Sequence, residues 1–340
     1  MPTAFNTKKY VQAQSEEILK RLKTFNKRFY FEIGGKLYAD MHASRVLPGY
    51  EPDAKLQVLS QIAENLELVY CVSAPDLERG KIYEDTGLPY PKQVFKDLEI
   101  LKKNNLNVSC VAITIYNGEK KADELKKKLD KLGVKNYVFN RIENYPTNLE
   151  LIISESGFGQ EHQIKFKERL VGITGPGGGS GKFSTCLIQL YHDYKQKHYS
   201  HYAKYETFPV WNLPIEHPVN LAYESATADL ADENQIDIYY KKKTGVDSVN
   251  YNRDIENYAL MKELLEKTAP GQTNWLSSPT EMGVNMIKEG LVNDSVVRKA
   301  AEKEILRRCG EYKKEHKNGL ESEATVKRAE EILKKAGLSS

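Results

Sequence analysis

Apolar residues recur along the chain at two spacings, one typical of buried strands and the other of amphipathic helices. Short apolar runs predict strands, and segments with apolar residues on one helical face predict helices. Their alternation indicates a parallel sheet buried on both faces, which is an α/β fold of Rossmann-like or P-loop-like type, with the sheet flanked by helices. The strands predicted in the first half are residues 29–33, 66–73, 108–116 and 136–140, and the helices are residues 8–25, 54–65, 91–104 and 120–132.

The same patterns divide the chain into three parts. Residues 1–160 form a Rossmann-like α/β domain, and the less regular stretch 141–168 marks its junction with the next part. Residues 161–290 form a second α/β domain, and residues 291–340 form a helical C-terminal segment. Further strands are expected at residues 170–174, 203–208, 236–240 and 249–251, and further helices at residues 255–267, 279–290, 294–315 and 322–336.

One segment, RLVGITGPGGGSGKFSTCLIQL at residues 169–190, joins an apolar strand to a helix through a cluster of glycines. Glycines let backbone N–H groups converge on an anion, and a helix N-terminus adds roughly half a positive charge. We therefore predict a phosphate-binding loop in which a lysine neutralises phosphate charge. The residues expected to bind the phosphorylated cofactor are Gly175, Gly177, Gly178, Gly179, Ser180, Gly181, Lys182, Ser184 and Thr185.

This loop matches the common phosphate-loop pattern, which is glycine, four free residues and then Gly-Lys-Ser/Thr, only in part. Gly181 and Lys182 stand in their places. Pro176, however, occupies the first glycine position, and Phe183 occupies the position of the hydroxyl residue that holds Mg²⁺. Hydroxyl residues follow only at the next positions, so the metal-binding arm is displaced or absent. No apolar strand ending in a metal-binding aspartate is evident downstream.

Two other interpretations of the loop stay open. Gly175, Gly177 and Gly181 form a spaced-out variant of the dinucleotide-binding fingerprint. Glu206, at the end of the next predicted strand, could accept a hydrogen bond from a ribose hydroxyl, which would make the chain an NAD(P)-dependent oxidoreductase. The lysine weighs against this interpretation, because a dinucleotide turn needs no cation there. Alternatively, the glycines only permit a tight turn, and the protein is a non-catalytic ligand-binding or assembly protein.

Four further residues are candidates for catalysis. His42 and Arg45 lie in a long, turn-rich segment, where they could serve acid–base chemistry and anion binding, or could simply be solvated at the surface. Arg253 and Asp254 follow the predicted strand 249–251, at the carboxyl end where open α/β sheets bind ligands. Asp254 is equally well placed to cap the following helix.

Composition narrows the partners and the location. A net charge of +3, with lysines mixed among carboxylates, argues against nucleic acid. No apolar run approaches the roughly 20 residues that span a bilayer, and the N-terminus has no apolar signal region, so we expect a cytoplasmic protein that does not bind membranes. The four cysteines are far apart, and we predict neither disulfides nor a metal site. The expected partner is a small phosphorylated ligand, and a homo-oligomer is left open.

Several segments together resemble one bacterial family, which is catalogued as a domain of unknown function and numbered eighteen forty-six. They are GGKLYADMHASRVLPGYEPDAK, GPGGGSGKFSTCLIQLYHDY, YETFPVWNLPIEHPVNLAYESATADL, VNYNRDIE and SPTEMGVNM, and the similarity covers nearly the whole chain. The resemblance implies that the glycine-rich turn, residues 42–45 and residues 251–254 belong to a shared pattern, but it supplies no reaction. It also implies a further C-terminal α/β domain in relatives, so we expect this chain to be a truncated or split form.

Some relatives in that family are labelled ATP-dependent peptidases. The chain has neither a Gly-x-Ser-x-Gly elbow nor a His-Glu-x-x-His helix, so peptidase activity is not supported. A phosphate-binding loop supplies positioning and charge neutralisation, which suit phosphoryl transfer or ATP-driven ligation. We therefore expect ATP or another phosphorylated ligand as the cofactor, with Mg²⁺ as an open question.

Overall fold

A computed structural model describes residues 3–83, 86–205 and 207–338 of the chain. The strands in this part are β1 (Phe29–Ile33), β2 (Leu66–Ser73), β3 (Val108–Tyr116), β4 (Asn136–Asn140), β5 (Leu170–Thr174), β6 (His201–Tyr205), β7 (Asn234–Ile236), β8 (Val249–Tyr251) and β9 (Gly283–Val284). Within the described residues, seven of them form one fully parallel sheet in the order β4-β3-β2-β5-β1-β6-β9. The strands β7 and β8 pair with each other in antiparallel fashion, outside that sheet.

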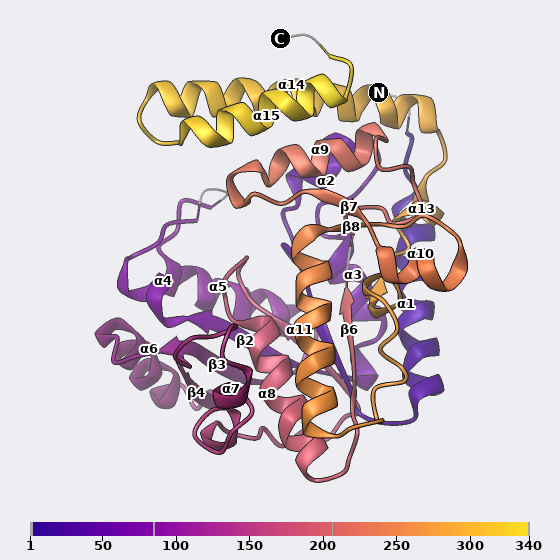
Figure 1. Cartoon of the computed structure of the whole chain (residues 1–340). Helices are drawn as coiled ribbons and strands as arrows, with labels where there is room; N and C mark the ends of the chain where they lie inside the picture. The colour runs from indigo at the N-terminus through magenta and orange to yellow at the C-terminus, as the bar shows by residue number, and fades with distance from the viewer. Residues whose placement is uncertain (1–2, 84–85, 206, 339–340) are drawn as a thin grey trace.

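Helices cover both faces of the sheet and extend beyond its edge (Figure 1). The α-helices are α1 (Thr7–Phe25), α2 (Met41–Val46), α3 (Ala54–Gln61), α4 (Ala74–Glu78), α5 (Tyr90–Lys103), α6 (Lys120–Lys131), α7 (Leu149–Ile152), α8 (Lys182–Lys195), α9 (Pro218–Ala226), α10 (Ile238–Thr244), α11 (Asn252–Thr268), α12 (Pro279–Met282), α13 (Ile287–Gly290), α14 (Asp294–Lys317) and α15 (Glu323–Lys335). Short 3₁₀ turns are η1 (Ala63–Asn65), η2 (Phe158–Gln160) and η3 (Ala228–Leu230).

The sheet separates two apolar cores. Both β2 and β5 are buried along their whole length, as expected for parallel strands covered on both faces. Successive side chains of a strand point to opposite faces. Phe31 therefore packs in the core that α1, α3 and α5 cover, whereas its neighbour Tyr30 packs in the core that α8 and α11 cover.

The position of β5 creates the crevice in which the glycine-rich loop lies. This strand stands between β2 and β1, although it follows both in the chain. From β2 the chain runs outward to β3, whereas from β5 it crosses β1 to reach β6. Connections that leave neighbouring strands in opposite directions open a crevice at the carboxyl ends of the strands, where open α/β sheets bind ligands. Residues 175–181 follow β5 directly at this crevice.

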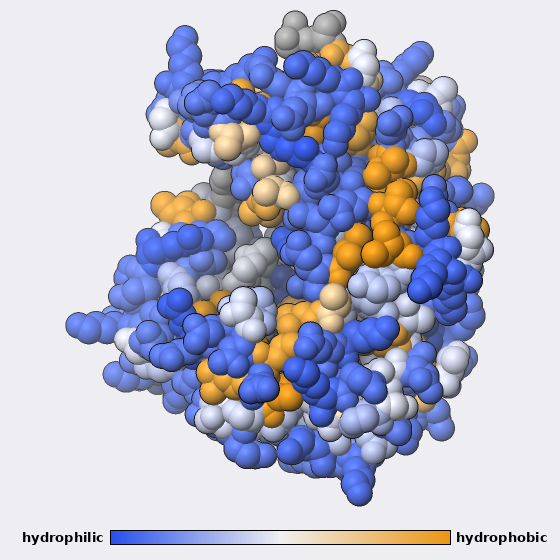
Figure 2. Space-filling view, in the orientation of Figure 1, coloured by the Kyte–Doolittle hydropathy of each residue, from blue (hydrophilic) through white to orange (hydrophobic). Residues whose placement is uncertain are grey.

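A layer of helices lies across the same edge of the sheet. The hairpin of α14 and α15 packs on α9, and α14 also contacts α2 (Figure 1). The molecular surface is hollowed between this layer and the region of α4 and α5 below it (Figure 2). The loop after β5 and the helical layer therefore face one another across the carboxyl edge of the sheet.

The predicted fold is confirmed: a parallel α/β sheet flanked by helices, with a helical C-terminal segment. The strand predicted at 170–174 and the two last helices lie where they were expected, apart from shifts of up to two residues. The predicted strand at 236–240 is wrong beyond its first residue, because the Asp237 carboxylate accepts from the N–H groups of Tyr239 and Tyr240 and starts α10. The expected helix at 279–290 is also wrong in part, since it divides into α12, β9 and α13.

Two further expectations concern the chain as a whole. The sheet takes strands from both sides of the predicted boundary at residue 160, and the division into domains stays a prediction. Among the helices of the described residues, none combines the length and the apolar character that crossing a membrane requires.

Candidate functional site

Close packing fixes both ends of the glycine-rich loop. Gly181 precedes α8 with a φ of 76°, and a Cβ there would lie 2.5 Å from the hydroxyl oxygen of Thr114. That hydroxyl donates a hydrogen bond of 2.9 Å to the carbonyl oxygen of Ser180. At the other end, a Cβ on Gly175 would lie 2.6 Å from the carbonyl oxygen of Cys71. The fold itself therefore requires glycine at these two positions.

The middle of the loop is different, because packing does not account for its glycines. Gly178 has no φ in the left-handed region, and a Cβ there would meet no atom within 4 Å. A Cβ on Gly177 would touch only the side chain of Tyr83, at an ordinary contact distance of 3.7 Å from its hydroxyl oxygen. Gly178 lines a cavity, so a side chain there would project into space rather than into the protein. A glycine here leaves the backbone accessible from the cavity, as close approach of a ligand would need.

Lys182 is folded back under the loop. Its side chain is buried, and the Nζ atom donates to the carbonyl oxygen of Gly177 at 2.8 Å and to the hydroxyl of Ser180 at 3.3 Å. Burial lowers the pKa of Lys182, and the nearby carboxylate of Glu32 opposes this shift. The ammonium group thus lies at the inner side of the loop, where it can neutralise a bound anion.

The two hydroxyl residues predicted to contact phosphate face different ways. Ser184 lines the cavity, with its hydroxyl donating to the carbonyl oxygen of Gly181 at 3.0 Å. Thr185 donates to the same carbonyl at 2.8 Å but is fully buried, and its hydroxyl accepts from the thiol of Cys71. The structure therefore brings Ser184 to the cavity and places Thr185 in the core beneath it.

A carboxylate that the sequence analysis missed lies beside the loop. Glu32 is a buried residue of β1, where it pairs in register with Ile173 of β5 and Lys204 of β6. Its carboxylate accepts a hydrogen bond of 2.5 Å from the hydroxyl of Tyr202. The available signal was the single acidic residue in the apolar strand FYFEI. Glu32 lies upstream of the loop, whereas the common phosphate-loop pattern places its acidic partner downstream.

Glu32, Lys182 and Ser184 line one cavity of about 560 Å³, a size typical of small-molecule sites. The ends of β3 and β4 supply an apolar wall, and the loop and α8 supply its floor. The helical layer closes the other side through Tyr223 and Thr227. Charged residues that line it are Lys55, Arg141, Lys182, Lys204 and Arg253, together with Glu32, Asp40 and Asp232.

The predicted pair Arg253 and Asp254 is divided between the cavity and its wall. Arg253 lines the cavity and binds the carboxylate of Asp232 at 3.1 Å. Burial raises the pKa of Asp232, and Arg253 opposes that shift. Asp254 is buried in the first turn of α11 and forms an ion pair with Lys204. Both residues thus reach the site, Arg253 directly and Asp254 through a lysine that lines it.

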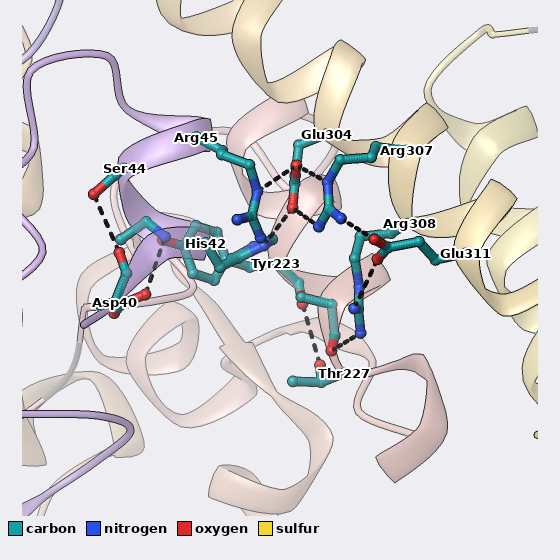
Figure 3. Close-up of polar contacts among 12 residues, drawn as sticks. Asp40, His42, Ser44, Arg45, Tyr223, Thr227, Glu304, Arg307, Arg308 and Glu311 are labelled. Atoms are coloured by element: carbon teal, nitrogen blue, oxygen red, sulfur yellow. Dashed lines mark hydrogen bonds and ion pairs between the residues drawn. The ribbon is translucent and has the colours of Figure 1, made fainter. Parts of the chain in front are cut away.

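His42 and Arg45 contact the helical layer. Both lie on α2 and contact the Glu304 carboxylate of α14, through His42 Nδ1 at 2.9 Å and Arg45 Nε at 2.9 Å (Figure 3). Arg307 completes the set with two hydrogen bonds of 2.6 Å to the same carboxylate. Neither predicted residue lines the cavity, and a catalytic role for them stays a prediction.

Electrostatics of this contact favour a neutral histidine and an ionised glutamate. Burial lowers the pKa of His42 despite the carboxylate beside it. Burial opposes ionisation of Glu304, but hydrogen bonds from Arg307, His42 and Arg45 outweigh it and hold the pKa of Glu304 well below its ordinary value. The cluster therefore fastens α14 to α2. Glu206, the predicted ribose-binding residue, lies outside the described residues.

Comparisons with known proteins agree on one family. A family model described as "Domain of unknown function DUF1846, N-terminal" matches residues 3–337. A UPF0371 protein of Fusobacterium nucleatum is 43% identical over 338 residues, which cover 99% of this chain and 66% of the relative. UPF0371 proteins of Clostridium tetani and Clostridium botulinum are 42% and 41% identical over the same length, covering 67% of each. The chain thus spans about two thirds of the curated relatives that it matches, and it belongs to the DUF1846 family.

Proposed function

We propose that the chain binds a nucleotide or another phosphorylated ligand at the glycine-rich loop, residues 175–184. The observation that carries this proposal is Gly178, where neither backbone conformation nor packing requires glycine and the missing side chain leaves the backbone open to the cavity. The N-terminus of α8 adds its partial positive charge at the same place. Lys182 adds a full charge from beneath the loop.

The reaction class that suits this arrangement is phosphoryl transfer or ATP-driven ligation. In both reactions the protein mainly positions the phosphates and neutralises the charge that develops on them. Arg253 lines the same cavity, where it can bind an anionic group of a second substrate. Lys204, held by Asp254, could do the same.

The test is isothermal titration calorimetry of the 340-residue chain with ATP, GTP, NADPH and inorganic phosphate. Lys182→Ala should weaken binding by roughly tenfold or more, because a hydrogen bond to a charged group contributes about 1.5–3 kcal/mol. Gly178→Ala should weaken binding without changing the melting temperature, since the methyl group would project into the cavity.

Matched controls are present in the chain. Gly310 on α14 also has an open Cβ position and no left-handed φ, so Gly310→Ala should leave binding unchanged. Lys195, at the far end of α8, serves as the control for the lysine. Absence of binding by all four probes would refute the proposal, and so would binding that Lys182→Ala leaves intact. Binding of NADPH without ATP would instead favour the dinucleotide interpretation.

A further inference from the structure

Arg141 differs from the other cations of the cavity, because its side chain is not engaged by the protein. Four of the five lining cations are bonded: Lys182 to the carbonyl of Gly177, Lys55 to the carbonyl of Gly34, Lys204 to Asp254 and Arg253 to Asp232. Across residues 3–83, 86–205 and 207–338, the Arg141 guanidinium has neither a hydrogen bond nor an ion pair. The planar fork of five N–H donors therefore stays available to a ligand.

The backbone of Arg141 is nevertheless held firmly. Its N–H donates to the carbonyl oxygen of Tyr116 at 2.8 Å, which ties the end of β4 to the end of β3. The preceding residue, Asn140, donates its backbone N–H to both carboxylate oxygens of Glu161, each at 3.1 Å. Because hydrogen bonds fix the backbone at Asn140 and at Arg141, the direction in which the side chain leaves is set by the fold.

A short path of contacts connects Arg141 to the loop. The Thr114 hydroxyl holds the carbonyl of Ser180, and Thr114 stands two residues before Tyr116, which holds Arg141. Two residues span at most about 7 Å in any conformation, a distance that an extended arginine side chain can cover. An anionic group bound beside Ser180 would therefore lie within reach of the guanidinium.

The residue between these contacts is conformationally strained. Ile115 lines the cavity with a φ of 57°, a left-handed conformation that is unusual for a β-branched residue. The register between β3 and β4 shifts at the same place, between Ile113 and Tyr116. Strain of this kind persists where a particular geometry is required, and functional sites are common places for it. Here it lets Thr114 reach the loop while Tyr116 positions Arg141.

We propose that Arg141 binds a second phosphate next to the one on the glycine-rich loop, so the ligand carries a pyrophosphate group. This inference rests on the proposed function and narrows its ligand class. Arginine suits the role, because its fork can grip two phosphate oxygens at once. A nucleoside diphosphate, a nucleoside triphosphate and a dinucleotide all carry this group, and the apolar wall formed by Ile115, Phe139, Ile142 and Tyr145 is next to Arg141 to receive a base.

The experiment compares inorganic phosphate with pyrophosphate, and AMP with ADP and NADH, by calorimetry on the whole chain. We expect pyrophosphate to bind roughly tenfold or more tightly than phosphate, and ADP to exceed AMP similarly. Arg141→Gln should remove both advantages while phosphate affinity stays the same, and Arg141→Lys should restore only part of them. Whichever of ADP and NADH binds more tightly, in a manner that depends on Arg141, indicates whether the pyrophosphate belongs to a nucleotide or to a dinucleotide. Either result supports the proposal.

Controls separate this inference from the proposed function. Arg298 is an exposed arginine of α14, far from Arg141 in the sequence, and Arg298→Gln should change no affinity. Pyrophosphate binding no tighter than phosphate in the wild type would overturn the inference, as would an advantage that survives Arg141→Gln. In both cases phosphate binding that depends on Lys182 would leave the proposed function standing. Because the Arg141 side chain has no partner in the described residues, Arg141→Gln should unfold at the wild-type temperature.

Discussion

The contact between α2 and α14 should depend strongly on the charge of Glu304. This carboxylate is buried, with 2% of its side chain exposed, and accepts from His42, Arg45 and twice from Arg307. In Glu304→Gln an amide N–H₂ group would replace one carboxylate oxygen, so that a donor would face donors and a hydrogen bond would be lost. Breaking a fully buried ion pair costs about 3–5 kcal/mol. The two arginines are 40% and 35% exposed and can regain water, so we expect a loss of about 2–3 kcal/mol.

The assay is urea denaturation followed by circular dichroism at pH 7, with the free energy of unfolding as the measured quantity. Glu302→Gln is the matched control, because Glu302 lies on the same helix and its carboxylate has no partner within the described residues. If Glu304→Gln and Glu302→Gln unfold at the same urea concentration, the reasoning about the buried carboxylate is refuted.

The pH dependence gives a second check with a defined sign. The pKa of Glu304 is lower in the folded state than in the unfolded chain, where glutamate titrates near 4.3. Its stabilising contribution is therefore complete above about pH 4.3 and is lost as pH falls further toward the folded-state pKa. The difference between wild type and Glu304→Gln should be constant from pH 8 to pH 5 and should shrink in more acidic solution. A difference that grows with acid would contradict this account.

Three further predictions concern other parts of the fold. Gly181→Ala should lose at least ~1–2 kcal/mol of stability from the left-handed backbone alone, with the Thr114 clash in addition, whereas Gly178→Ala should unfold like wild type in the same urea series. Burial lowers the pKa of His201 to about 4, so wild type should lose stability as pH falls from about 6.5 toward 4. His201→Phe should lack that loss, as urea denaturation at pH 7 and pH 5 would show. The Glu67 carboxylate accepts hydrogen bonds from the backbone N–H groups of Lys167 and Glu168, at 2.7 and 2.9 Å, so Glu67→Ala should lower the free energy of unfolding by about 2–3 kcal/mol in calorimetry. Glu64→Ala, which removes an exposed side chain, is the control, and equal melting points for the two variants would contradict this prediction.

Sequence patterns located the glycine-rich loop because everything that defines it is local. An apolar strand, a run of glycines and an amphipathic helix follow one another within residues 169–190, and β5 begins and ends where the pattern places it. Glu32 and Arg141 reach the same cavity from strands far away in the chain. Their contribution depends on the order of strands in the sheet, which hydrophobic periodicity cannot reveal.

Charged residues posed a different difficulty. His42 and Arg45 have the side chains of an acid–base or anion-binding site, yet the partner that engages both is Glu304, more than 250 residues later in the chain. A helix-docking cluster and a catalytic cluster draw on the same residue types. The three-dimensional contact shows that His42 and Arg45 dock α14, and a catalytic role for them stays a prediction. Arg253 does line the cavity, but its prediction assumed a strand of the parallel sheet, whereas β8 pairs with β7 in antiparallel fashion outside that sheet.

The place of β1 in the sheet has a consequence for how the chain acquires its structure during synthesis. Within the described residues, the only strands that pair with β1 are β5 and β6, and β6 ends at Tyr205. The apolar segment Phe29–Ile33 therefore waits, without its native hydrogen-bonding partners, while more than 130 further residues are made. Such distant pairing slows folding and prolongs the exposure of apolar strand edges. A ribosome-bound chain that ends before β5 should consequently be a strong target for chaperones, and release should follow once β5 and β6 have emerged.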